Sequence, residues 1–468
     1  MLDAIKTSQN YRWYVLATVA IGTFMATLDS SIVNVALPTI SGQFHSDLTT
    51  LQWVVSAYLL TITSLLPVFG RIADMFGRKK IYTLGFVMFT MGSVLCGFAQ
   101  NIWFLVGTRV LQAVGASMLM SNSAAIITAI FPPKERGRAL GFTGSVVALG
   151  SLTGPALGGL LIGFTSWRAI FFINLPIGII GYFAACFILP KDLPSKDNES
   201  FDFTGAFAFT FGMIFLLLGI TNGESWGWLS VPVLASLVLG IVSLVGFVFT
   251  ERRVQHPMID LSLFRNRPFL IGNLSGGLSF VAMFANNMLL PFYLQGILHY
   301  KPTQVGLMLM VFPMVMVFVA PVSGHASDKF GPIILTTSGL AISSLGLFYF
   351  STLPATASFI RIIPGPILMG LGSGMFQSPN NSSVMSSVPP QKLSIAGGIN
   401  SLVRNLGMVI GIAFSVSLFD VWGGVTLPQP SQVQGFMSAY HSVMLVAMGI
   451  AFVAALISYN RKSYAKSN

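Results

Sequence analysis

Two residues of opposite charge lie within segments that are otherwise apolar. Asp29 falls in the first long apolar segment, within residues 28–38, and Arg109 falls in the fourth. A charge in the hydrocarbon of a membrane costs about 3 kcal/mol or more, so each residue requires a partner, water or a function. If the first helix ends near Pro38 and the fourth begins near Asn101, both charges lie about 12–14 Å below the same surface, at 1.5 Å per residue.

A carboxyl and a guanidinium at equal depth could load and release a proton. Burial disfavours the charged carboxylate, whereas a neighbouring guanidinium favours it. A carboxyl held between these opposing effects can change its protonation when its surroundings open to one side or the other. We therefore expect Asp29 and Arg109 to couple transport to protons. The alternative is a permanent ion pair that holds the first helix to the fourth.

Uncharged polar residues within the apolar segments could line a cavity for a solute. In lipid such side chains need a partner or water. For any one of them, hydrogen bonding between helices explains its presence as well as substrate contact does. Arg404 is a further basic residue inside a span, and no acidic partner for it is visible in the sequence. The candidates are Asn34, Gln112, Asn122, Asn273, Asn286, Asn287, Gln377, Asn380, Asn381 and Arg404.

The sequence lacks the residue patterns that ATP hydrolysis, metal binding and intramembrane transferase chemistry require. A G-x-x-x-x-G-K-[ST] phosphate-binding loop is absent, which argues against ATP as the energy source. The five histidines do not cluster, so no metal site is indicated. An intramembrane transferase would need several carboxylates to hold a metal and a diphosphate. We expect no enzymatic activity and no cofactor, with the proton gradient as the driving force.

The composition requires a membrane protein. Of 468 residues, 54% are hydrophobic and only 8% are charged, with a net charge of +11. A soluble domain carries roughly 25% charged residues. The basic residues are scattered between apolar segments, which argues against a nucleic-acid partner. About fourteen segments approach the 20 residues needed to cross a bilayer: 13–37, 51–70, 81–99, 102–127, 138–163, 168–189, 203–221, 230–250, 268–292, 303–322, 333–352, 360–385, 394–419 and 437–459.

Lys and Arg are distributed unevenly over the connections between these segments. With both termini on one side, that side receives 20 of the 25 basic residues, whereas the opposite side receives only Arg168, Lys301 and Arg361. Cytoplasmic connections carry the excess of Lys and Arg. We therefore expect an even number of spans and two cytoplasmic termini.

One motif occurs twice. Residues 70–77 and 324–331 both read G-x-x-x-D-x-F-G, 254 residues apart (324 − 70), and each copy follows the second span of a six-span set. Two parallel six-span halves with an inserted pair of spans explain this spacing. The sequence predicts an N-terminal bundle over 1–190, linkers and an extra helix pair over 191–267, and a C-terminal bundle over 268–468.

The chain resembles the major facilitator superfamily, and within it the fourteen-span drug:proton antiporters of bacteria. The resemblance covers nearly the whole chain. It is carried by four stretches: residues 28–38, 70–80 (GRIADMFGRKK), 109–116 (RVLQAVGA, with Ala113 where glycine is usual) and 144–159. The last is similar to the antiporter motif of the fifth helix. It includes Gly150, Gly154, Pro155, Gly158 and Gly159, whose small residues allow close packing against a helix of the other half, which would prevent leakage through the empty carrier.

The resemblance implies a fold and a function. The fold is an all-α polytopic membrane protein with two six-helix bundles and two extra transmembrane helices. In that fold the first and fourth helices, which carry Asp29 and Arg109, would face a central cavity. The function is proton-coupled export of small amphipathic or cationic compounds, such as drugs, by a monomer in the bacterial cytoplasmic membrane. The alternative is a flippase or exporter of a lipid, cell-envelope precursor or endogenous metabolite. Gly70, Asp74, Gly77, Arg78 and Glu135 would form a cytoplasmic latch, with Asp74 near the helix start at Leu393 and Arg78 paired with Glu135.

Overall fold

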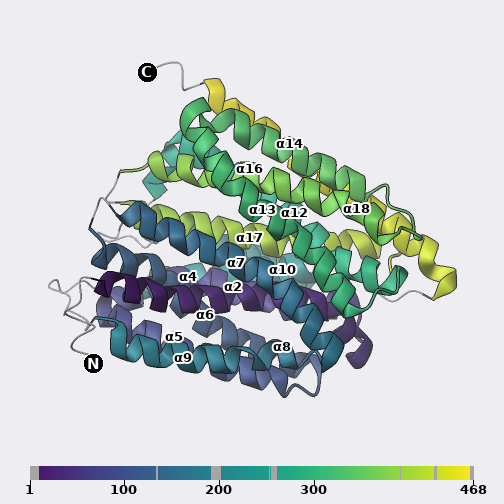
Figure 1. The fold of residues 1–468 in the computed structure, drawn as a ribbon, viewed down its shortest axis with the longest axis horizontal. Coiled ribbons are helices and arrows are strands. Elements are labelled where there is room, and N and C mark those ends of the chain that lie inside the picture. The colour runs from purple at the N-terminus through teal and green to yellow at the C-terminus, as the bar shows by residue number, and fades with distance from the viewer. Residues whose placement is uncertain are drawn as a thin grey trace.

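The computed structural model describes residues 10–132, 135–190, 202–251, 253, 261–389, 392–425 and 429–463, and these contain helices but no strand (Figure 1). Helices run back and forth along one direction. The long ones, with short neighbouring helices that extend three of them, are α2 (Tyr11–Phe44), α3 and α4 (Leu48–Leu51 and Trp53–Phe76), α5 (Arg78–Gly97), α6 (Ile102–Ile130), α7 (Arg136–Phe164), α8 and α9 (Ala169–Phe172 and Asn174–Ile188), α10 (Phe203–Trp226), α11 (Val231–Glu251), α12 (Arg267–Phe292), α13 (Pro302–Phe330), α14 (Pro332–Phe350), α15 and α16 (Phe359–Ile362 and Pro364–Ser386), α17 (Leu393–Val421) and α18 (Val433–Tyr459).

The helix lengths confirm the predicted fold class. Within the described residues, thirteen helical segments are long and apolar enough to cross a membrane. α7 is a fourteenth long helix of 29 residues, and its part Leu149–Phe164 is apolar. The protein is therefore an all-α, multi-pass membrane protein. α2 begins and α18 ends at the same end of the molecule, which we call the terminal end; the opposite end is called the far end (Figure 1).

Two groups of helices pack side by side. α2 packs on α7 and α9, and α5 on α6, whereas α12 packs on α17 and α18, and α14 on α16. The groups meet where α7 lies against α13 and α4 against α17. The predicted linkers fall largely on residues 191–201 and 254–260, which lie outside the described residues. The domain boundaries therefore stay a prediction.

The repeated motif ends in the same kind of turn in both groups. α4 ends at Phe76, and Gly77 follows with φ 110° before α5 begins. α13 ends at Phe330, and Gly331 follows with φ 80° before α14 begins. A side chain with a Cβ rarely adopts positive φ. The final glycine of each copy is thus required by the sharp reversal from one membrane helix to the next.

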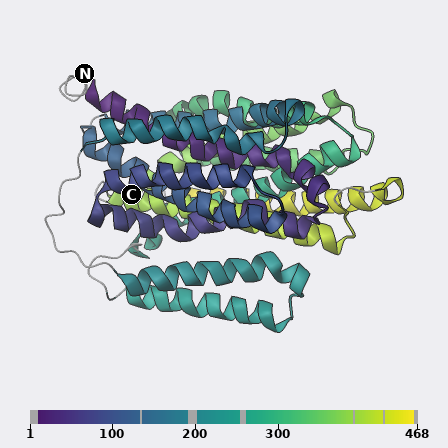
Figure 2. The same cartoon turned by 90° about the horizontal axis from the view of Figure 1, so that it is seen from below.

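α10 and α11 stand apart from the other helices as an antiparallel pair (Figure 2). α10 contacts both α4 and α17, so the pair covers one side of the seam between the two groups. Its hydrogen bonds run to α4 and its N-terminal connection: Gln52 Nε2 donates to Thr221 O (3.3 Å), and Thr210 Oγ1 donates to Ser64 O (3.3 Å). α11 contributes many exposed apolar side chains, such as Val238. This exposure is suited to lipid.

Hydrogen bonds join the two groups at the far end. Thr49 Oγ1 donates to Asp420 Oδ2 (2.7 Å), and Gln295 Nε2 donates to Val35 O (3.1 Å). A longer contact of 3.5 Å links Thr39 Oγ1 to Gln295 Oε1. All three of these contacts lie at the far end, as does the packing of Gly159 on α7 against Pro302 on α13. The far end is therefore closed in this structure.

Candidate functional site

The structure brings Asp29 and Arg109 together. Arg109 Nη1 donates to Asp29 Oδ2 at 2.5 Å, and the two side chains are 1% exposed or less. The other carboxylate oxygen, Oδ1, accepts from Gln112 Nε2 (2.8 Å) and from Asn174 Nδ2 (3.0 Å). Both oxygens of Asp29 are thus satisfied by donors. This arrangement meets the need for a partner that a buried charge imposes.

Arg109 has acceptors other than Asp29. Its Nε donates to Val54 O on α4 (3.1 Å), and Nη1 also donates to Gln112 Oε1 (2.7 Å). The guanidinium carbon lies 3.9 Å from the centre of the Tyr58 ring, a cation–π distance. The cation is therefore held by three groups besides the carboxylate. A neutral Asp29 would not leave Arg109 without partners.

Three helices position this network through local sequence features. Asn101 caps α6 by accepting from Phe104 N at 2.8 Å, which fixes the start of the helix that carries Arg109 and Gln112. α5 approaches α6 so closely that a Cβ added to Gly92 would lie 2.5 Å from Gln112 N. The absence of a side chain at Gly92 therefore permits this packing. Asp29 on α2 and Arg109 on α6, which were predicted to lie at equal depth, are thus in direct contact.

Sequence reasoning missed Asn174 and placed Asp29 differently. Asn174 on α9 is fully buried and also donates to Ser93 Oγ at 3.0 Å. The signal was available, since Asn174 is a polar residue in a strongly apolar span. Asp29 was expected to face a central cavity. It lies instead on the face of α2 that packs against α6 and α9, inside the first group of helices.

The predicted latch is only partly recovered. Asp74 at the end of α4 and Arg78 at the start of α5 form an ion pair across the Gly77 turn (2.8 Å), and Arg78 Nη1 also donates to Ala125 O (3.2 Å). The expected Arg78–Glu135 pair is wrong for this conformation. Glu135 pairs instead with Arg12 at 3.1 Å, because the connection before α7 lies beside the first turn of α2. The side chain of Leu393 lies outside the described residues, so the contact predicted for Asp74 stays a prediction.

The glycine motif of α7 makes close helix contacts on two sides. A Cβ on Gly150 would overlap Thr27 Oγ1, and one on Gly154 would overlap Ser31 Oγ, both on α2; Gly158 faces Ile32 of the same helix. Gly159 faces α13, where an added Cβ would lie 2.6 Å from Pro302 O, and Pro155 O lies against Gly306. The motif was expected to pack against the other half. It does so at Pro155 and Gly159, whereas the other three glycines pack within their own half.

The predicted cavity residues separate into two sets. Gln112 belongs to the Asp29 network, and Asn122 donates locally to Met118 O at 2.8 Å. Asn273 also bonds within its own helix, to Phe269 O. Asn286 is buried, and Asn34 and Asn287 are half-buried, away from the pocket described next. The remaining four, Gln377, Asn380, Asn381 and Arg404, come together.

These four residues line a pocket between α12, α16 and α17. Asn400 joins them and donates to Asn381 Oδ1 at 3.0 Å. Asn380 Nδ2 donates to Gly272 O (3.1 Å), and its Oδ1 accepts from Arg461 Nη2 (2.5 Å). Arg461 lies just beyond α18, and burial lowers the pKa of its guanidinium to about 10, so it stays charged at neutral pH. We call this the polar pocket. Its lining residues are Gly276, Phe280, Phe376, Gln377, Asn380, Asn381, Asn400, Val403 and Arg404.

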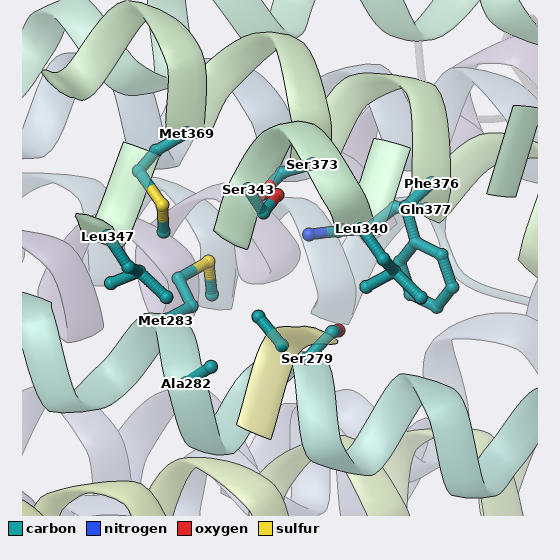
Figure 3. Close-up of a pocket in the computed structure, with 11 residues that line it drawn as sticks. Ser279, Ala282, Met283, Leu340, Ser343, Leu347, Met369, Ser373, Phe376 and Gln377 are labelled. Atoms are coloured by element: carbon teal, nitrogen blue, oxygen red, sulfur yellow. The ribbon is translucent and has the colours of Figure 1, made fainter. Parts of the chain in front are cut away.

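A second pocket adjoins the polar pocket through Phe376 and Gln377, which line both. Figure 3 shows Met283 and Met369 on one side and the side-chain amide of Gln377 entering from the other. Ser279, Ser343 and Ser373 add hydroxyl groups. We call this the methionine pocket. Within the described residues, no group of three or more His, Cys, Asp and Glu side chains could hold a metal ion.

The sequence matches a known family along nearly its whole length. The family model of the Major Facilitator Superfamily matches residues 19–412 and 273–463. The riboflavin transporter RibZ of Clostridioides difficile is 36% identical over 96% of this chain and 97% of its own. The multidrug resistance protein Stp of Mycobacterium tuberculosis is 33% identical over 88% of this chain and 76% of its own.

Solved structures share the fold at low sequence identity. A bacterial homologue of the human lysosomal transporter Spinster, in an inward-facing and unoccupied conformation, superposes with a TM-score of 0.69 at 15% identity. That match covers 97% of this chain and 98% of the other. The peptide-family transporter PepTSo gives a TM-score of 0.70, also at 15% identity, over 98% and 99% of the two chains. Identities this low support the fold alone.

Proposed function

Because this chain belongs to the Major Facilitator Superfamily and is therefore a membrane transporter, we propose that it exports small amphipathic compounds in exchange for protons. Multidrug exporters among its relatives, such as Stp, support the direction and the kind of substrate. The chain would work by alternating access, with the closed far end opening in the other half of the cycle. The proton gradient would supply the energy, without a cofactor.

The geometry around Asp29 is the observation that supports proton coupling best. Protonation removes one charge of the pair and would leave a bare cation in a dry site. Here Val54 O, Gln112 Oε1 and the Tyr58 ring already surround Arg109. Both protonation states of Asp29 are therefore provided with partners.

The same contacts suggest how protonation reaches the gate. Arg109 donates to Val54 O on α4, and the segment before α4 bears Thr49, which bonds Asp420 at the far end. Neutralising Asp29 frees Arg109 to move toward its α4 partners. A small displacement of α4 would then weaken the far-end bond. Proton loading and opening of the far end would be linked through this one helix.

The orientation completes the proposal. The excess of Lys and Arg at the terminal end favours cytoplasmic termini. The far end, where Asp29 is nearer to the surface, would then face the outside, and external protons would enter from there. We place the protein in a bacterial cytoplasmic membrane, working as a monomer, and its latch residues Asp74 and Arg78 on the inner side.

Transport in proteoliposomes tests the coupling. Purified wild type and Asp29→Asn would be assayed for pH-driven movement of fluorescent amphipathic dyes and of riboflavin. Asp29→Asn keeps the shape and loses the titratable group, so we expect pH-driven transport to fall to background. Asp47→Asn is the matched control: Asp47 caps α3 by accepting from Thr50 N (3.2 Å), and asparagine caps equally well. Full coupled transport by Asp29→Asn would exclude the proton role.

A second candidate is transport of a heterocyclic metabolite. RibZ matches 96% of this chain at 36% identity and is described as a riboflavin transporter. The same assay separates the candidates. Selective transport of riboflavin, with no movement of unrelated dyes, would favour a metabolite carrier over a multidrug exporter.

A further inference from the structure

The polar pocket is rich in donors and poor in acidic groups. None of its nine lining residues is an aspartate or a glutamate, whereas Arg404 lines it directly. Arg461 adds a second positive charge behind Asn380, and its side chain is only 6% exposed. Arg404 thus lines one small cavity of about 40 Å³ with no carboxylate among its described wall residues, and the charge of Arg461 acts on it from behind Asn380.

Arg404 lacks the partners that a guanidinium inside a membrane helix requires. In the part of the chain that the structure describes, its side chain makes no hydrogen bond or ion pair, and its Nε is buried without an acceptor. A guanidinium carries five N–H donors in a planar fork. Leaving such donors unsatisfied in a low-dielectric site is costly. This contrasts with Arg109, for which the protein supplies every acceptor.

Arg461 positions the pocket wall. It passes between α12 and α16 over Gly272, where an added Cβ would overlap its Nη2, and it binds Asn380 Oδ1. This bond orients the Asn380 amide, whose Nδ2 donates to Gly272 O. Nε and Nη1 of Arg461 are buried without acceptors. Among the described residues no carboxylate pairs with it, so its positive charge acts on the pocket.

We propose that the polar pocket binds the anionic group, a carboxylate or a phosphate monoester, of an amphipathic substrate. Arg404 binds the anion through its fork of donors, in the bidentate manner that carboxylates and phosphates favour. The side-chain amide of Gln377 donates a further hydrogen bond. Arg461 is a positioning residue, which holds Asn380 in place. The assignment rests on the proposed function, because it names the class of substrate that the exporter carries.

The methionine pocket, whose cavity is only about 10 Å³ in this structure, would widen to take the apolar part of the same substrate. It is continuous with the polar pocket through Phe376 and Gln377 and is lined by Met283, Met369 and Leu347 (Figure 3). Thioether side chains adapt their shape to different apolar bodies. The combination selects one charged end and tolerates many apolar ends. An organic cation, which the sequence resemblance also allowed, would be repelled by the two guanidinium groups.

Binding of two dyes of opposite charge tests this assignment. Fluorescein and rhodamine 123 share a xanthene skeleton, but the first is an anion and the second a cation. Purified full-length protein in detergent, without a proton gradient, would be titrated with each dye and followed by fluorescence polarisation. We expect fluorescein to bind at least about tenfold more tightly, the effect of one charge-assisted hydrogen bond. Equal binding of the two dyes, or tighter binding of rhodamine 123, would overturn the proposal. This comparison uses the wild-type protein alone.

Variants locate the site. Arg404→Gln should weaken fluorescein by about tenfold or more and leave rhodamine 123 unchanged or improved, while Arg404→Lys should fall between, since it keeps the charge and loses the fork. Arg361→Gln removes an exposed arginine on α15 and is the matched control. Fluorescein binding that survives Arg404→Gln would contradict the assignment. If that variant does not fold, Gln377→Leu serves in its place, with a weaker loss expected.

Two further arms separate the alternatives. Inorganic phosphate should compete only weakly, because it lacks the apolar body; competition at the affinity of fluorescein would show a site for inorganic anions and overturn the substrate assignment. Asp29→Asn should bind fluorescein as wild type does. Charge-selective binding by a wild-type protein that shows no proton-driven transport would therefore contradict the coupling alone. Coupled transport with binding that ignores charge would contradict the anion site alone.

Discussion

The two halves place different chemistry at corresponding positions. Moving 254 residues along the repeat takes Asp29 to Met283 and Ser93 to Leu347. The helix contacts agree, since Gly92 of α5 lies against Gln112 of α6 and Gly346 of α14 lies against Met369 of α16. Met283, Leu347 and Met369 accordingly meet in one pocket, as Asp29, Ser93 and Gln112 meet around Asn174.

This difference suggests that the two halves have different functions in transport. The N-terminal half holds a sealed network in which the carboxylate and the guanidinium are paired and which can serve a proton. The C-terminal half replaces it with thioether and alkyl groups and carries its arginine, Arg404, unpaired in a pocket. A shared packing scheme therefore supports one half for ions and the other for organic substrates. The following predictions test this comparison.

The largest expected effect is on the charged network. Arg109→Met would leave Asp29 buried without its cation, which typically costs about 3–5 kcal/mol. We expect a large loss of thermal stability in detergent and no coupled transport. The control is Met369→Leu in the other half, a swap of similar volume that should cost less than about 1.5 kcal/mol. Equal losses in the two variants would contradict the assignment of different roles to the two halves.

Close helix packing, in contrast, should matter equally in both halves. A Cβ on Gly154 would overlap Ser31 Oγ, and one on Gly411 of α17 would lie 2.5 Å from Val281 O on α12. Gly154→Val and Gly411→Val should each cost about 1–3 kcal/mol through overpacking. Gly246→Ala, with open space around it, is the control. Thermal unfolding of the three proteins measures the effect, and a cost in one half only would show unequal packing.

The far-end contacts should have a smaller effect. Thr49→Val removes the donor to Asp420 and should weaken closure by about 1 kcal/mol, the net value of one hydrogen bond. The populations of closed and open far end would then shift roughly fivefold. Distances between spin labels on the two halves would report the shift. Unchanged populations would show that other contacts hold the far end closed.

The smallest change in stability is expected from making the two halves alike. Asp29→Met combined with Arg109→Met replaces the ion pair by thioether side chains of the kind that line the methionine pocket. Buried pairs exchanged for apolar residues of similar volume are often neutral in stability or better. We expect a folded protein that lacks pH-driven transport. Retained coupling in this double variant would sharply contradict the role given to Asp29.

The sequence was sufficient for the spans, the repeat and the meeting of Asp29 with Arg109, because each follows from a one-dimensional count of residues along helices. It was not sufficient for rotation about the helix axis. Asp29 was expected on a cavity wall and lies inside a bundle, and Asn174 was overlooked for the same reason. The Arg78–Glu135 pair is not formed in this structure, where Arg12, far away in sequence, pairs with Glu135 instead; it stays a prediction for the conformation with a closed cytoplasmic side.

The attachment of α10 and α11 has a mechanical consequence. The hydrogen bonds seen from α10 run to Ser64 of α4 and to Gln52 just before it, both on one side of the seam. The pair therefore travels with the N-terminal half when the halves rock. That half sweeps a larger area of bilayer than its partner, and its motion meets more viscous drag. The C-terminal half, which is smaller by two helices, would move faster. The rate of motion of the N-terminal half would therefore depend more strongly on membrane fluidity than that of the C-terminal half.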